Sequence, residues 1–317
     1  MTRSIAFALI LICTTPLAAL EEPAQLKTLS GTIYGTLLVP ESKTPVPIVL
    51  LVAGSGPTDR NGNIGGTNGN NCTKLLAEAL ASKGIATLRY DKRGIAESAA
   101  AMRSETEIRF ENYVDDAAAW VEQLRKDPRF SFIAIAGHSE GSLIGMIAAQ
   151  RGGVKRYISI AGAGVRASAL IHEQLAGKVP PHLQEASDKA LASLDEGKTT
   201  DAPQELASLF HASVQPYLIS WFKYDPSKEI AKLRIPVLIV QGTTDIQVSI
   251  EQAKTLKKAK PDASLVLIEG MNHVLKLVEL DQQKQVASYM SEPALPIAPQ
   301  LVDAIVAFVR AQKSAGS

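Results

Sequence analysis

The chain has 317 residues, enough for one large α/β domain with an insertion or for two ordinary domains. Hydrophobic residues make up 46% of the sequence and charged residues 21%, a composition typical of a globular protein and not of a disordered one. Because 33 basic and 32 acidic residues nearly cancel and form no basic block, nucleic acid and anionic membrane surfaces are not expected partners, and a small neutral substrate fits better.

The first twenty residues have the pattern of a secretory signal peptide. Arg3 precedes a short apolar core, and small residues up to Ala19 follow it. This core is too short to span a bilayer as a permanent helix. We therefore expect residues 1–19 to be removed on export, no stable membrane insertion, and a secreted or periplasmic location for residues 20–317. Only Cys72 would remain as a cysteine, so no intramolecular disulfide could form.

Short apolar runs alternate with helical patterns along the rest of the chain. This alternation is typical of repeated βα units and predicts a mostly parallel central sheet flanked by helices. The expected strands cover residues 33–40, 47–53, 85–90, 131–136, 155–161, 236–241 and 264–269. The expected helices cover about 72–82, 112–126, 140–151, 249–259 and 299–312.

A long segment between Ala161 and Pro236 interrupts this alternation, because it shows helical spacing and no strand signal. We interpret it as a helical cap over about residues 165–232, inserted after the sixth strand-like run, and not as a separate domain. Late in this segment lies an aromatic cluster that includes Trp221 and Phe222. These aromatic residues provide either ordinary cap packing or an apolar wall for an acyl or aryl group of the substrate.

The sequence GHSEG at residues 137–141 lies where a predicted strand passes into a predicted helix. Such a turn is so tight that only small residues fit two positions before and after the serine, and its strain lifts Ser139 out of the sheet. A hydroxyl is a poor nucleophile near neutral pH, so a catalytic serine needs a histidine to take its proton and an acid to orient that histidine. A glycine-flanked helix cap would explain Ser139 alone but not such partners.

Two later loops supply the partners. Asp245 follows the predicted strand 236–241, and His273 follows the next predicted strand. Catalytic groups of open α/β sheets gather at the carboxyl ends of parallel strands, where both residues stand. The chain order Ser, Asp, His is that of hydrolases with a nucleophile elbow. We therefore predict Ser139 as the nucleophile, His273 as the general base and Asp245 as the acid that orients it.

A tetrahedral intermediate also needs donors for its negative oxygen. The loop 53-AGSGP-57 follows a predicted strand, and its glycines let a backbone N–H point at this charge. We assign the two donors of the oxyanion hole to the backbone N–H groups of Ser55 and of Glu140, the residue after the nucleophile.

Other polar residues are expected to have structural roles. His138 should pack under the turn and take no part in catalysis, and Arg93 should hold a loop through an ion pair. His172, His182 and His211 of the cap share no spacing typical of a metal site. No phosphate-binding loop and no complete dinucleotide fingerprint appears in the sequence. We therefore expect neither a metal nor a cofactor.

Several segments together resemble the bacterial α/β-hydrolases, in particular their secreted esterase and serine-aminopeptidase-like branch. They are 53-AGSGPTDRNGN-63, 89-RYDKRGIAES-98, 137-GHSEGS-142, 242-GTTDIQV-248 and 270-GMNH-273. The resemblance spans about residues 28–312 and implies the α/β-hydrolase fold and the same site roles. One departure is Ala53, which stands where many lipases and esterases of this fold have a histidine.

The sequence thus predicts a serine hydrolase that cleaves small carboxylic esters through an acyl-enzyme on Ser139. It predicts no particular oligomeric state. One alternative is a serine aminopeptidase or another hydrolase of short peptides, although the acidic residues of the cap are scattered and form no obvious site for an α-amino group. A less favoured alternative is a binding protein that keeps the fold without catalysis. A complete set of Ser, His and Asp argues against it.

Overall fold

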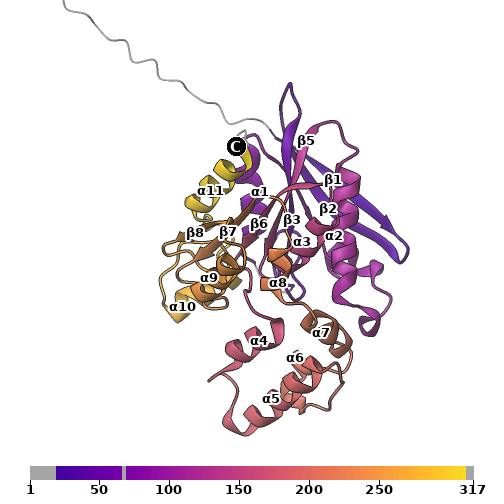
Figure 1. Cartoon of the computed structure of the whole chain (residues 1–317), viewed down its shortest axis with the longest axis vertical. Helices are drawn as coiled ribbons and strands as arrows, with labels where there is room; N and C mark the ends of the chain where they lie inside the picture. The colour runs from indigo at the N-terminus through magenta and orange to yellow at the C-terminus, as the bar shows by residue number, and fades with distance from the viewer. Residues whose placement is uncertain (1–18, 66–68, 312–317) are drawn as a thin grey trace, which may run out of the picture.

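The computed structural model describes residues 19–65 and 69–311 (Figure 1). Its strands are β1 (Ala19–Thr28), β2 (Gly31–Pro40), β3 (Val46–Val52), β4 (Ala86–Tyr90), β5 (Phe130–His138), β6 (Val154–Ile160), β7 (Val237–Gly242) and β8 (Ser264–Ile268). They form one sheet in the order β1-β2-β4-β3-β5-β6-β7-β8. β2 runs antiparallel to both neighbours, and all other pairs are parallel. The predicted mostly parallel sheet is therefore confirmed.

Strand β1 was not predicted from the sequence. This strand contains two glutamates and Pro23, lies at the edge of the sheet and has mostly exposed side chains. It lacks the apolar run of a buried strand, and an edge position tolerates proline. Five of the expected strands precede the cap, and the additional strand β1 makes β6, directly before the cap, the sixth strand of the sheet. Of the predicted signal peptide, only Ala19 belongs to the described residues.

Helices cover both faces of the sheet (Figure 1). They are α1 (Cys72–Ser82), α2 (Phe110–Leu124), α3 (Glu140–Gln150), α8 (Pro226–Ala231), α9 (Ile250–Ala259), α10 (Gln282–Met290) and α11 (Pro299–Arg310), with short 3-10 helices at Ala96–Ala101 and Glu105–Glu107. Apolar side chains of α2, α3 and α9 form one buried layer with the strands, and those of α1 and α11 form the other. Burial of these apolar faces is the main source of stability. The polar helix α10 was not predicted.

The insertion between β6 and β7 forms a cap that projects from one end of the sheet (Figure 1). Its helices are α4 (Ala167–Leu175), α5 (Pro181–Asp195), α6 (Ala207–Phe210) and α7 (Gln215–Phe222), with a 3-10 helix at Gln204–Leu206. They share an apolar cluster of their own. α8 also lies in the predicted cap range, yet Ile230 of this helix belongs to the core of the main body. A hydrogen bond connects the cap to the main body: the Ser220 hydroxyl on α7 accepts it from the N–H of Phe110 on α2, at 2.8 Å.

Candidate active site

Ser139 occupies a sharp turn between β5 and α3. Its backbone angles, φ 55° and ψ −123°, lie in a region that non-glycine residues rarely adopt. Neighbouring backbone leaves no room for larger residues: a Cβ on Gly137 would lie 2.1 Å from the carbonyl oxygen of Gly141, and one on Gly141 would lie 2.2 Å from that of Val52. The turn therefore has the tight geometry predicted for a nucleophile elbow.

His273 and Asp245 form a buried pair. Nδ1 of His273 lies 2.8 Å from Oδ2 of Asp245, and their side chains are only 6% and 1% exposed. Asp245 also accepts hydrogen bonds from the N–H groups of Gln247 (2.8 Å) and Val248 (2.9 Å) and from the Gln241 amide (3.0 Å). Burial alone would raise the pKa of Asp245, but His273 and the N–H groups of Val248 and Gln247 outweigh burial and lower it. The carboxylate thus stays charged and holds Nδ1 of His273, which leaves Nε2 for proton transfer.

His138 packs against the loop that carries His273. Its Nε2 donates a 2.8 Å hydrogen bond to the backbone carbonyl oxygen of His273, and the centres of the two rings lie 4.7 Å apart. Burial lowers the pKa of His138 to about 3, with a further contribution from His273. His138 is therefore neutral and supports the loop, in agreement with the structural role expected for it.

The two predicted oxyanion donors flank the serine. Ser55 and Glu140 line the same pocket as Ser139, and a Cβ on Gly54 would lie 3.1 Å from Cβ of Ser139. Glu140 is the first residue of α3, so its N–H has no partner within the helix. No residue in the described ranges accepts a hydrogen bond from the N–H of Ser55. Neither N–H group therefore has a hydrogen-bond partner among the described residues.

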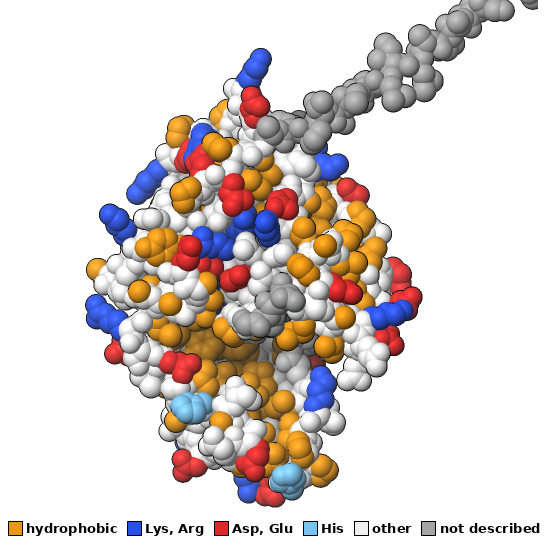
Figure 2. Space-filling model, turned by 180° about the vertical axis from the view of Figure 1, so that it is seen from behind, with side chains coloured by type: hydrophobic (Ala, Val, Ile, Leu, Met, Phe, Trp, Pro, Cys, Tyr) orange, Lys and Arg blue, Asp and Glu red, His pale blue; other side chains and the backbone are white. Residues whose placement is uncertain are grey.

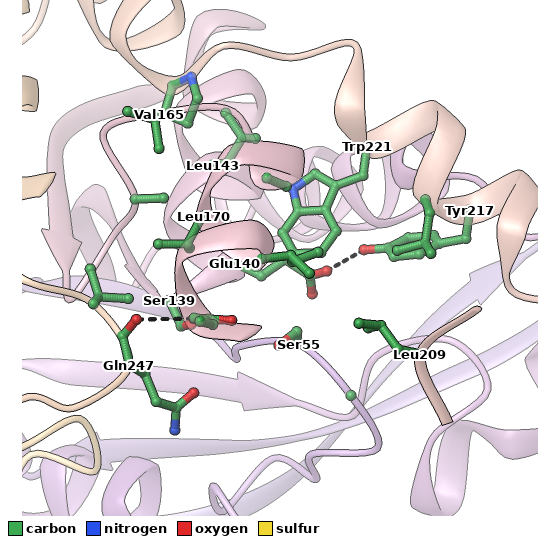
Figure 3. A pocket seen from close by; sticks show the side chains of 18 of the residues that line it. Ser55, Ser139, Glu140, Leu143, Val165, Leu170, Leu209, Tyr217, Trp221 and Gln247 are labelled. Atoms are coloured by element: carbon green, nitrogen blue, oxygen red, sulfur yellow. Dashed lines mark hydrogen bonds between the residues drawn. The ribbon is translucent and has the colours of Figure 1, made fainter. Parts of the chain in front are cut away.

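Two pockets meet at Ser139. The first, which we call the cap pocket, has a volume of about 320 Å³ and lies between the body and the cap (Figure 3). A hollow lined by hydrophobic side chains is visible between these two parts in Figure 2. Its apolar lining comes from both parts: Leu143, Ala163, Val165, Ala167, Leu170, Ile171, Leu209, Val214, Leu218, Trp221, Pro226 and Val248.

The second pocket, which we call the His273 pocket, has a volume of about 280 Å³. It shares Ser55, Gly56, Ser139 and Gln247 with the cap pocket, but its lining is more polar. The residues that line this pocket alone are Ala53, Gly54, Thr58, Gly62, Ile64, Asn70, Cys72, Thr73, His138, His273, Val274 and Tyr289. His273 therefore lines the His273 pocket but not the cap pocket.

The prediction that Phe222 lines the substrate pocket is corrected by the structure. Trp221 does line the cap pocket, but Phe222 is fully buried in the apolar cluster of the cap helices. Successive residues of a helix point about 100° apart, so two neighbours on α7 face different surroundings. The sequence pattern gave no way to decide which face of α7 borders the pocket.

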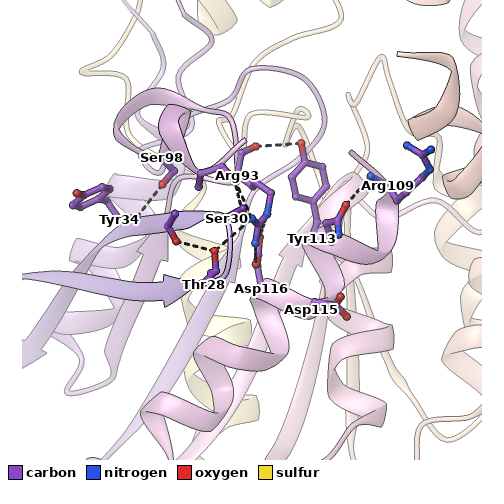
Figure 4. A network of polar contacts seen from close by, with 12 residues as sticks. Thr28, Ser30, Tyr34, Arg93, Ser98, Arg109, Tyr113, Asp115 and Asp116 are labelled. Carbon is purple, nitrogen blue, oxygen red and sulfur yellow. Dashed lines mark hydrogen bonds and ion pairs between the residues drawn. The ribbon is translucent and has the colours of Figure 1, made fainter. Parts of the chain in front are cut away.

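Arg93 lies outside both pockets and holds a loop, as expected. Its guanidinium binds Asp116 of α2 (2.6 and 3.1 Å) and the carbonyl oxygen of Ala101 (3.0 Å), and it also donates to Ser30 (Figure 4). The side chains of Arg93 and Asp116 are 12% and 4% exposed. This buried network connects the loop after β4 to α2 and to the turn between β1 and β2.

Within residues 19–65 and 69–311, no group of three or more His, Cys, Asp or Glu side chains could hold a metal ion. His172, His182 and His211 thus form no such group with one another. A search of the same residues finds no helix long and apolar enough to cross a membrane.

Known proteins share this fold. Residues 65–211 match the family described as serine aminopeptidase, S33. Esterase EstD of Thermotoga maritima is 26% identical over 246 residues, which cover 76% of this chain and 57% of EstD. This chain thus matches little more than half the length of that relative.

Solved structures extend the comparison. Est1E of Butyrivibrio proteoclasticus with bound ferulic acid aligns with a TM-score of 0.57 and 20% identity, over 84% of this chain and 94% of Est1E. The acylaminoacyl peptidase of Pyrococcus horikoshii aligns with a TM-score of 0.52 and 17% identity, over 80% of this chain and 38% of the peptidase. The chain has the α/β-hydrolase fold, as its sequence motifs predicted.

Proposed function

We propose that this protein is a serine hydrolase that cleaves carboxylic esters through an acyl-enzyme on Ser139. The observation that carries the proposal is the buried pair of His273 and Asp245 beside a pocket that Ser139 also lines. The strained turn at Ser139 and the two N–H groups next to it supply the other parts that acyl transfer needs. Similarity to esterase EstD favours an ester as the substrate.

The reaction follows from these positions. Nε2 of His273 takes the proton of the Ser139 hydroxyl as Oγ attacks the ester carbonyl carbon. The carbonyl oxygen becomes negative and accepts hydrogen bonds from the N–H groups of Ser55 and Glu140. When the C–O bond breaks, the leaving alkoxide takes the proton from His273 and departs as the alcohol. A water molecule then repeats these steps on the acyl-enzyme and releases the acid.

The two pockets separate the two halves of the ester. The leaving oxygen must lie beside His273, because this residue returns the proton to it. Since His273 borders only the second pocket, the alcohol belongs in the His273 pocket and the acyl group in the cap pocket. The apolar walls of the cap pocket favour an aliphatic or aryl acyl group.

A peptidase is the second candidate, favoured by the match to the S33 serine aminopeptidase family. Recognition of a free α-amino group requires a carboxylate that can pair with it. Glu140 is the single acidic residue among the described residues that line the two pockets. Its carboxylate is already bound by Lys92 and by the Tyr217 hydroxyl. This arrangement favours an ester over the N-terminus of a peptide.

Hydrolysis of a p-nitrophenyl ester series from acetate to dodecanoate, beside an aminoacyl p-nitroanilide series, tests the proposal. We expect ester turnover in the wild type and its loss in Ser139→Ala, with a fluorophosphonate probe labelling only the wild type. Turnover of the anilides alone would replace the esterase by a peptidase. A folded wild type that the probe does not label would favour the non-catalytic binding protein.

We also propose that residues 1–19 direct export, to the periplasm or beyond. The support is the sequence pattern alone. Cleavage after Ala19 would keep β1 from Leu20 onward. Expression of the full chain in a bacterial host should yield an extracytoplasmic protein whose N-terminus lies near Leu20. A protein that retains Met1 in the cytoplasmic fraction would contradict this proposal.

A further inference from the structure

Lys92 is a buried cation that the mechanism above does not use. It follows β4, while Gly54 follows β3 and Glu140 follows β5, so three adjacent strands bring these residues together. The ammonium nitrogen of Lys92 lies 2.8 Å from the Glu140 carboxylate, and both side chains are only 2% exposed. It also donates a 2.5 Å hydrogen bond to the carbonyl oxygen of Gly54 and lies 4.9 Å from the centre of the Tyr113 ring.

A gain in stability does not explain why this ion pair is buried here. Removing two charges from water is costly, and an apolar pair of similar size is often as stable or more so. The position of the pair is more informative, because Gly54 and Glu140 each belong to a segment that carries one proposed oxyanion donor. Lys92 itself lines neither pocket, so it does not reach the substrate.

The contact with Gly54 fixes the direction of the first donor. The described residues contain no cis peptide bond, so the C=O of Gly54 and the N–H of Ser55 point to opposite sides of one planar group. Lys92 holds the C=O on one side. The N–H of Ser55 must then point away from Lys92. Because Ser55 and Ser139 line the same pocket, we place the acceptor of this N–H, the negative oxygen of the substrate, in that pocket.

The contact with Glu140 restrains the residue that carries the second donor. The N–H of Glu140 is that donor, and the carboxylate of the same residue holds Lys92. The Tyr217 hydroxyl, on α7 of the cap, donates to the other carboxylate oxygen (Figure 3). Burial and the nearby Glu140 raise the pKa of Tyr217 well above its usual value, so the hydroxyl keeps the proton that it donates.

We propose that Lys92 is a positioning residue of the oxyanion hole. Its ammonium group holds the Gly54–Ser55 peptide and Glu140 in one arrangement, so that both N–H donors are aligned before the substrate binds. Donors that are aligned in advance stabilise a transition state more strongly, because they need no reorganisation during the reaction. The inference rests on the proposed function, since it assigns a role within the same site.

The double variant Lys92→Met/Glu140→Gln tests this role, because it removes both charges and leaves neither one unpaired. We expect its kcat for the best p-nitrophenyl ester to fall about 10- to 100-fold, somewhat less than the loss of a whole oxyanion donor, while KM changes less than about threefold. Affinity for a trifluoromethyl ketone with the same acyl chain should fall by the same factor as kcat, since its adduct carries the oxyanion.

A matched control is Arg93→Met/Asp116→Asn, which removes a buried ion pair outside both pockets. We expect this variant to lower the melting temperature but to keep kcat and ketone affinity. Lys92→Met alone leaves the Glu140 carboxylate bound by the Tyr217 hydroxyl and should lower kcat and ketone affinity by about the same 10- to 100-fold, which provides a test if the double variant does not fold.

The inference is overturned if the folded Lys92→Met/Glu140→Gln protein keeps wild-type kcat and ketone affinity. It is also overturned if the Arg93 control loses both to the same extent, or if a folded Lys92→Met protein keeps both. Wild-type protein with no ester turnover and no fluorophosphonate labelling is a different result. It would reject the proposed function, and this inference with it.

Discussion

The imidazole of His138 donates to the backbone carbonyl oxygen of His273, and the two rings lie 4.7 Å apart. His138 thus supports the loop that carries His273. Because burial lowers the pKa of His138 to about 3, it carries no charge beside the proposed base at neutral pH. A charged neighbour at this distance would disfavour the protonated His273 that the reaction forms.

The burial of His138 predicts how stability depends on pH. Its pKa falls from 6.5 in the unfolded chain to about 3 in the folded protein, so the unfolded chain binds the extra proton first as pH falls. The contribution of neutral, buried His138 to the free energy of unfolding is complete above pH 6.5. It is lost as the pH falls below this value, by about 2 kcal/mol on going to pH 5. Free energies of unfolding, measured with urea above pH 6.5 and at pH 5, should show this loss in the wild type and a smaller loss in His138→Gln. Equal losses in the two proteins would contradict the assignment.

Asp245→Asn should leave the fold intact and slow ester hydrolysis. Asparagine nearly matches the shape of aspartate but cannot hold His273 in the tautomer that frees Nε2. We expect kcat to fall about 10³- to 10⁴-fold, as in comparable triads, with circular dichroism unchanged. Steady-state kinetics and the rate of fluorophosphonate labelling measure this effect. A loss below about tenfold would show that Asp245 does not orient the base.

Trp221 and Phe222 are neighbours with different expected effects. Trp221→Ala should enlarge the cap pocket and shift the preferred acyl chain of p-nitrophenyl esters to longer lengths. Phe222→Ala should instead destabilise the fold by about 3–5 kcal/mol through a cavity in the cap cluster, with the chain preference unchanged. Chain-length profiles and urea unfolding of both variants separate these effects. A shifted profile in Phe222→Ala alone would reverse the assignment.

Leu170→Trp tests the separation of acyl and alcohol pockets. Leu170 lines the cap pocket and not the His273 pocket, so a larger side chain there should exclude long acyl chains. Relative rates for methyl to butyl esters of one short acid should stay the same. Both series are measured by pH-stat titration of the released acid. A variant that discriminates among the alcohols and not among the acids would place the two halves of the ester the other way round.

The sequence allowed prediction of the residues that directly follow strands. Ser139, Asp245 and His273 each stand at the carboxyl end of a recognisable apolar strand, and parallel strands bring such ends to one edge of the sheet. Their approximate places therefore followed from spacing alone. The pairing of His273 with Asp245 needed only that neighbouring strands be adjacent in the sheet, as β7 and β8 are.

Other features depend on contacts that spacing does not reveal. Lys92 meets Glu140 only because β4 and β5 lie on either side of β3, an order that the strand patterns do not specify. Which of two neighbouring aromatic residues borders the cap pocket depends on the rotation of α7, and the polar edge strand β1 has no apolar run to mark it. These features follow from tertiary packing, which overrides local pattern.

Mass spectrometry can detect the acyl-enzyme on Ser139 that the proposed reaction requires. The protein would be quenched in acid during turnover of a p-nitrophenyl ester, and its intact mass and peptides compared with those of Ser139→Ala. We expect a mass increase of one acyl group on the peptide that contains Ser139, absent from the variant. An acyl group on another residue, or rapid turnover by Ser139→Ala, would contradict it.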